Sequence, residues 1–86
     1  MYEALISHEA EKYYKRQATD TKLRINKCID SISREPLFGS NIKKLHGKLE
    51  GKYRYKVGDI RIVYEVNTKN KIVEIKSIGG RGDIYK

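Results

Sequence analysis

Two segments near the N-terminus have the patterns of a short strand and a following helix. Residues 2–6 are mostly apolar over a length that is common for strands. Ser7 is of a type that favours the N-cap position, and Glu9 and Glu11 would lie in the first helical turn, where carboxylates suit the helix dipole. We therefore predict a strand over residues 2–6 and a helix over residues 8–17.

A second helix is indicated by an apolar stripe at helical spacing. Its members recur at i, i+3, i+4 and i+7, and they are Ile25, Cys28, Ile29 and Ile32. Thr19 or Asp20 is expected to cap the start of this helix, and Pro36 to end it, because proline lacks the N–H that a helix interior needs. The two helices follow each other closely in the chain, so we expect a helical hairpin.

From Gly51 onward the pattern changes to alternating polar and apolar residues. The alternation covers residues 52–57 and 60–66 and is interrupted at Gly58 and Asp59. Two alternating segments separated by a two-residue turn of this kind predict a β-hairpin.

A third strand, rich in Ile and Val, is expected over residues 71–78, and a short edge segment at residues 84–85. The predicted order is β-α-α-β-β-β. This is an α+β fold, with the helical hairpin packed on one face of an antiparallel sheet. A chain of 86 residues is expected to form a single domain over residues 1–86.

The two-residue turn also predicts which side chains share a face of the hairpin. One face, expected to be the core, has Tyr53, Tyr55, Val57, Ile60, Ile62 and Tyr64; the other has Lys52, Arg54, Lys56 and Arg61. Lys56 would lie opposite Arg61, and like charges at such positions are destabilising. This favours a phosphate-binding surface, since a guanidinium can donate to two oxygens at once. Lysines that protect a sheet edge are the alternative, which accounts less well for the arginines.

The overall charge is consistent with a polyanionic partner. Nineteen Lys and Arg residues against eleven Asp and Glu give a net charge of +8. Seven basic and two acidic residues lie between positions 43 and 61, so this segment has a net charge of +5 out of the total of +8. Nucleic acid is the commonest partner of such a surface, although charge alone fits a merely basic protein equally well.

Several other classes of protein are disfavoured by the sequence. Cys28 is the only cysteine and lies on the apolar stripe, so we expect a core residue and no disulfide framework. His8 and His46 are not spaced with carboxylates as metal ligands are, and we predict no metal site. No Gly-rich phosphate loop, membrane-length apolar segment or signal peptide is recognisable, so we expect a cytoplasmic protein without a membrane role.

A resemblance extends over essentially the whole chain. Residues 51–65 read Gly-Lys-Tyr-Arg-Tyr-Lys-Val-Gly-Asp-Ile-Arg-Ile-Val-Tyr-Glu, and residues 78–85 read Ile-Gly-Gly-Arg-Gly-Asp-Ile-Tyr. With Lys43-Lys44-Leu45 upstream, these segments resemble the RelE/ParE superfamily of bacterial toxin–antitoxin toxins. The resemblance implies a toxin silenced by a cognate antitoxin. The RelE branch cleaves mRNA in the ribosomal A site by 2′-hydroxyl attack, without metal or other cofactor, whereas the ParE branch poisons DNA gyrase.

Residue by residue, the resemblance implies a catalytic set and matches Arg54, and the basic hairpin face and the basic segment of residues 43–61 add the other RNA-binding candidates. The catalytic set is Lys56, Arg61, Arg81 and Tyr85, and the RNA-binding set is Lys43, Lys44, Lys52 and Arg54. Arg61 and Arg81 would hold the scissile phosphate. Arg54 stands where lysine is common in the RelE branch, and Gly80 stands where Lys or His is common. Because arginine does not deprotonate in proteins, the general base is either Lys56 or Tyr85. Tyr85 could instead stack on an RNA base or simply be a residue of an edge strand.

A ribosome-dependent mRNA endonuclease is therefore the first functional expectation. The alternatives are a ParE-like inhibitor of DNA gyrase and a non-catalytic nucleic-acid-binding module. The expected partners are a cognate antitoxin, the ribosome and mRNA. We expect the free toxin to be monomeric and the silenced toxin to form a hetero-oligomer, in which acidic residues of the antitoxin complement the net charge of +8.

Overall fold

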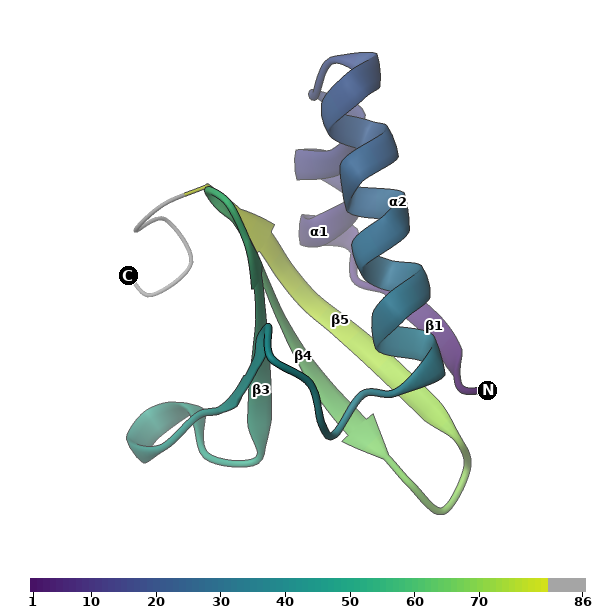
Figure 1. Ribbon diagram of the computed structural model, residues 1–86, viewed down its shortest axis with the longest axis vertical. Helices are drawn as coiled ribbons and strands as arrows, with labels where there is room; N and C mark the ends of the chain where they lie inside the picture. The colour runs from purple at the N-terminus through teal and green to yellow at the C-terminus, as the bar shows by residue number, and fades with distance from the viewer. Residues whose placement is uncertain (81–86) are drawn as a thin grey trace.

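The computed structural model describes residues 1–80 of the chain. Its elements, in chain order, are β1 Glu3–Ile6, α1 His8–Lys15, α2 Thr19–Arg34, β2 Ile42–Lys44, a short 3-10 helix Gly47–Leu49, β3 Lys52–Val57, β4 Ile60–Asn67 and β5 Ile72–Gly79. The strands form one sheet in the order β1-β5-β4-β3-β2. Both helices lie against the same face of this sheet, which confirms the α+β fold with a helical hairpin on one face (Figure 1).

The direction of β1 differs from the expectation. β1 pairs with β5 in parallel, with Glu3 opposite Ile72 and Ile6 opposite Ile75. The sheet is therefore mixed, and the prediction of a wholly antiparallel sheet was wrong at this edge. An apolar segment indicates that a strand is present, but it does not indicate the direction of the strand or the strand with which it pairs. Here the partner, β5, lies at the far end of the described chain.

β2 is a strand that the sequence pattern did not predict. It pairs antiparallel with β3, with Ile42 opposite Tyr55 and Lys44 opposite Tyr53. It is only 3 residues long and has two lysines, so it is too short to show the alternation by which strands are recognised. The edge segment expected at residues 84–85 lies outside the described residues.

The start of α1 follows the prediction closely. The Ser7 hydroxyl accepts a hydrogen bond from the Ala10 N–H at 3.1 Å and donates one to the Lys76 carbonyl at 2.8 Å. This N-cap therefore also joins the helix to β5. The start of α2 differs by one residue: Ala18 is the N-cap, without a side-chain hydrogen bond, and Thr19 is already helical.

The core lies between the helices and the predicted apolar face of the hairpin. Tyr55, Ile60, Ile62 and Tyr64 are buried together with Ile25, Cys28 and Ile32 of α2. Tyr64 is fully buried, and its hydroxyl donates a hydrogen bond of 2.7 Å to the Pro36 carbonyl. Burial, reinforced by the neighbouring Tyr53 and Tyr55, raises the pKa of Tyr64 above its ordinary value. The helices thus cover the predicted core face.

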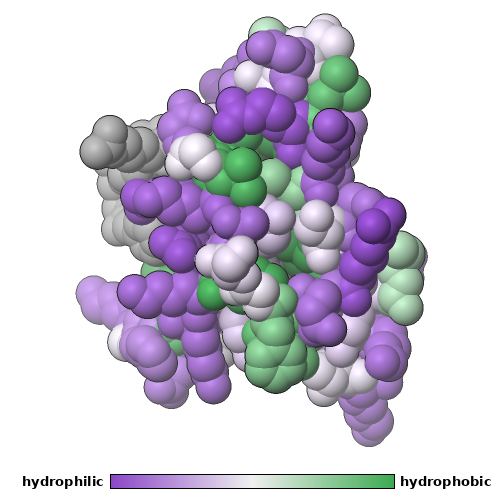
Figure 2. Space-filling view, in the orientation of Figure 1, coloured by the Kyte–Doolittle hydropathy of each residue, from purple (hydrophilic) through white to green (hydrophobic). Residues whose placement is uncertain are grey.

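One face of the molecule is largely hydrophilic (Figure 2). In the view of Figure 2, hydrophilic residues predominate and apolar residues appear as small separate patches. Within residues 1–80, neither helix is long and apolar enough to cross a membrane.

Candidate functional site

The face of the sheet that points away from the helices has the basic side chains. Lys56 lies directly opposite Arg61, and Arg54 opposite Val63, so the hairpin register is the predicted one. Gly58 has a φ of +59°, whereas Asp59 does not have a positive φ. A two-residue turn with glycine in the left-handed region at its first position is of type II′, which suits the twist of the two strands. The turn thus holds Lys56 and Arg61 at the same end of the sheet.

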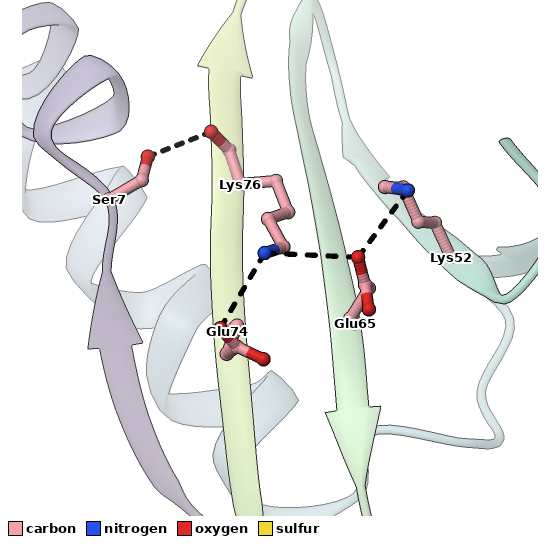
Figure 3. Close-up of polar contacts among 5 residues, drawn as sticks. All are labelled: Ser7, Lys52, Glu65, Glu74 and Lys76. Carbon is pink, nitrogen blue, oxygen red and sulfur yellow. Dashed lines mark hydrogen bonds and ion pairs between the residues drawn. The ribbon is translucent and has the colours of Figure 1, made fainter.

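One half of this exposed face is neutralised by ion pairs. We call it the ion-paired half, and it consists of Lys52, Glu65, Glu74 and Lys76 (Figure 3). Lys52 Nζ lies 3.3 Å from Glu65 Oε1, and Lys76 Nζ lies 3.8 Å from the same oxygen and 3.5 Å from Glu74 Oε2. The register between β4 and β5 shifts between Val63 and Tyr64, so Lys76 is the additional residue on β5. Here each lysine has a carboxylate partner.

The other half of the face is the cationic cluster, made of Arg54, Lys56 and Arg61. Within residues 1–80, neither Arg54 nor Lys56 forms an ion pair. Arg54 is partly buried, and its Nε atom is buried without a hydrogen-bond partner among those residues. The cluster therefore presents concentrated positive charge, which favours binding of an anion such as phosphate.

A hollow of about 380 Å³ lies beside the β3–β4 turn. Lys56, Gly58, Asp59 and Arg61 are its described lining residues. Two of the four are cationic and come from adjacent strands, so the lining favours an anion over a cation. The lining carboxylate, that of Asp59, has its Oδ1 3.8 Å from the Arg24 guanidinium of α2.

The whole sequence was compared with known families and with solved structures. A family model described as the ParE toxin of the type II toxin-antitoxin system parDE matches residues 3–85. The chain belongs to this toxin family. A search of the curated proteins gave no match.

Solved structures of type II toxins share the fold. The toxin–antitoxin complex RelBE2 from Mycobacterium tuberculosis has a TM-score of 0.82 at 21% identity, over 93% of this chain and 98% of that chain. The archaeal RelE-RelB complex from Pyrococcus horikoshii OT3 has a TM-score of 0.80 at 28% identity, over 95% and 97%. A YoeB-YefM complex from Staphylococcus aureus has a TM-score of 0.73 at 26% identity, over 90% and 93%. The toxin is thus similar to RelE and YoeB toxins over nearly its full length.

The structure brings some of the predicted RNA-binding residues together and separates others. Lys43 lies opposite Arg54 and so extends the cationic cluster onto β2. Lys44 lies opposite Tyr53, on the face that packs against the helices, because successive side chains of a strand alternate between faces. Lys52 is on the predicted face, but its charge is compensated by Glu65.

The catalytic residues predicted for the toxin fall into two groups. Lys56 and Arg61 lie opposite each other, as the hairpin register predicted, and both line the hollow. Arg81 and Tyr85 lie outside the described residues. Sequence reasoning did not single out Asp59 as a lining residue or Arg24 as its partner, since nothing in the sequence relates a helix residue to a distant turn.

Other residues whose side chains could take part in catalysis or metal binding occupy core or surface positions. Cys28 is buried, and desolvation raises the pKa of its thiol, although Arg24 opposes this shift. Cys28 is therefore a core residue, as predicted. His8 and His46 are exposed. Among the described residues, no group of His, Cys, Asp and Glu is arranged to hold a metal ion.

Proposed function

We propose that the toxin is a metal-independent endoribonuclease that cleaves mRNA in the ribosomal A site. The observation that supports this proposal most strongly is the cationic cluster at a hollow large enough for a phosphodiester. The cluster is built on two hydrogen-bonded strands, so its charges are fixed in place before a substrate arrives. The resemblance to the RelE branch supplies the reaction type.

The reaction is an intramolecular phosphoryl transfer. The 2′-hydroxyl oxygen forms a bond to the adjacent phosphorus, and the bond from phosphorus to the 5′-oxygen breaks. The products are a 2′,3′-cyclic phosphate and a 5′-hydroxyl end. Negative charge increases on the phosphate oxygens in the transition state, where Arg61 and Arg81 donate hydrogen bonds to them.

Two protons move in this reaction. A base removes the proton of the 2′-hydroxyl, and an acid protonates the departing 5′-oxygen. Lys56 and Tyr85 are the candidates for these roles. Arg54 holds charge and does not exchange protons, because a guanidinium stays protonated in proteins. Its role in the proposal is to position the RNA backbone beside Lys56.

The proposal includes a cognate antitoxin that silences the toxin. The solved RelE and YoeB relatives named above are toxin–antitoxin complexes. We infer that an acidic segment of the antitoxin covers the cationic cluster, since charges of opposite sign favour association with a chain of net charge +8. In this proposal the free toxin is a monomer and the silenced toxin part of a hetero-oligomer.

Primer extension on a defined mRNA tests the nuclease proposal. The purified toxin is incubated with the mRNA, with and without programmed ribosomes, and in the presence of EDTA. We expect cuts only with ribosomes, undiminished by a level of EDTA that leaves the ribosomes intact, and absent for a folded Arg81→Ala variant. The same preparation is assayed for inhibition of DNA gyrase supercoiling. Gyrase inhibition without mRNA cuts would overturn the proposal in favour of a ParE-like activity.

A further inference from the structure

The side chain of Arg24, which belongs to α2, extends to the turn between β3 and β4. Its Nη2 atom lies 3.8 Å from Asp59 Oδ1. A Cβ atom added at Gly58 would lie only 2.8 Å from the same Nη2. The positive φ of the turn favours glycine at position 58, whereas the guanidinium is the far end of a flexible side chain and could shift away from a Cβ.

The position of Asp59 creates an electrostatic problem for anion binding. Its carboxylate belongs to the lining of the same hollow as Lys56 and Arg61. An unrestrained carboxylate there competes with a phosphate for Lys56 and also repels the phosphate. Arg24 Nη2 lies 3.8 Å from this carboxylate, and because both side chains are largely exposed the contact offsets part of its charge.

We propose that Arg24 is a positioning residue for the substrate phosphate. Arg24 holds the Asp59 carboxylate on the helix side of the turn, and thereby keeps it away from Lys56, which the RNA phosphate contacts in this proposal. This inference rests on the proposed function in one respect, that an RNA phosphate occupies the hollow. It assigns Arg24 an effect on RNA binding that is exerted through Asp59, without contact between Arg24 and the substrate.

Removal of Arg24 is therefore expected to weaken RNA binding more than the loss of one distant charge does. The probe is a fluorescein-labelled 2′-O-methyl RNA hexamer, which has no free 2′-hydroxyl and so is not cleaved. Its Kd is measured by fluorescence anisotropy at low salt with the full chain. We expect Arg24→Ala to raise the Kd roughly tenfold, and Arg24→Lys, which keeps the positive charge, to restore part of the loss.

Two further variants distinguish positioning from simple charge loss. Arg34→Ala removes the same charge from the same helix, where Arg34 Nη2 pairs with Asp30 at 2.9 Å. We expect this control to raise the Kd by about twofold or less, the effect of a distant charge in salt. Arg24→Ala combined with Asp59→Asn should return the Kd to within about twofold of the wild type, because the competing carboxylate is then absent.

The outcomes separate this inference from the nuclease proposal. Equal Kd values for Arg24→Ala and Arg34→Ala would overturn it, as would a double variant that binds as weakly as Arg24→Ala. No binding of the hexamer by the folded wild-type toxin would overturn it too. If the wild type binds the hexamer with the expected pattern but cuts no mRNA on ribosomes, only the nuclease proposal fails. Arg24→Ala and the double variant both lack Arg24, so both are expected to melt at a similarly lowered temperature. The difference in Kd between these two variants then decides the result.

Discussion

The two halves of the exposed sheet face treat their basic residues in opposite ways. In the ion-paired half, Lys52 lies directly opposite Glu65 and forms an ion pair with it. In the cationic cluster, the equivalent cross-strand position opposite Lys56 is occupied by Arg61. The same two strands therefore accommodate a stabilising pair at one end and a destabilising pair at the other. The proposed function accounts for this difference, because a surface that binds RNA phosphate needs cations that acidic neighbours do not neutralise.

The largest effect on mRNA cleavage is expected when an opposite-charge pair like that of the ion-paired half is introduced into the cationic cluster. Lys56→Glu places a carboxylate opposite Arg61, as Glu65 lies opposite Lys52. We expect mRNA cleavage on programmed ribosomes to fall by at least roughly 100-fold, since the carboxylate repels the phosphate and occupies Arg61. The free energy of unfolding should rise by about 0.2–1 kcal/mol, because a like-charge pair becomes an opposite-charge pair. Single-turnover kinetics and urea unfolding measure the two effects, and a loss of both activity and stability would contradict the comparison.

A substitution in the core, on the opposite side of the sheet from both halves, should lower the free energy of unfolding. It should leave the functional contrast between the two halves unchanged. Tyr64→Phe removes the buried donor to the Pro36 carbonyl, which leaves that oxygen without its partner. We expect a loss of about 1 to 3 kcal/mol in the free energy of unfolding, with cleavage by the folded protein within about twofold of the wild type.

The same variant has a pH signature. Tyrosine in an unfolded chain ionises near pH 10, whereas burial raises the pKa of Tyr64 in the folded state. Its stabilising contribution is fully present below about pH 10. It is lost as the pH rises further, because the unfolded state releases a proton that the folded state keeps. Urea unfolding between about pH 8 and pH 11 should therefore show a shallower decline for Tyr64→Phe than for the wild type, and equal slopes would contradict this assignment.

The smallest effect is expected within the ion-paired half. Glu65→Gln leaves Lys52 and Lys76 without the carboxylate that they share. We expect a loss of up to about 1 kcal/mol in the free energy of unfolding, because these pairs are partly exposed to water. Glu74→Gln, which removes only one contact of Lys76, is the matched control and should cost less. Cleavage should change by less than about twofold in both variants, and a large loss of cleavage in Glu65→Gln would extend the functional surface into this half.

Local features of the fold were predictable from the sequence because their causes are local. Ser7 caps its helix through a hydrogen bond three residues away, and Gly58 sets a two-residue turn. The turn then determines the register of the hairpin, so the sequence correctly predicts Lys56 opposite Arg61. This short sequence separation is the reason that the relative positions of Lys56 and Arg61 were predictable.

Features that depend on distant contacts were not predictable in the same way. The parallel pairing of β1 with β5 and the three-residue strand β2 each require a partner that no local pattern identifies. β2 in turn decides that Lys43 joins the cationic cluster while Lys44 faces the helices. The approach of Arg24 to the turn depends on how α2 packs on the sheet, which a helical stripe defines only roughly.

Cleavage of mRNA by two matched variants tests most directly whether the cationic cluster is the catalytic surface. Arg61→Ala and Lys76→Ala each remove one positive charge from the same face, one from the cluster and one from the ion-paired half. Single-turnover cleavage on programmed ribosomes is measured for both, alongside the wild type and with folding verified by circular dichroism. We predict a loss of at least roughly 100-fold for Arg61→Ala and a change of less than about threefold for Lys76→Ala. Equal losses in the two variants, or full activity of Arg61→Ala, would contradict the assignment.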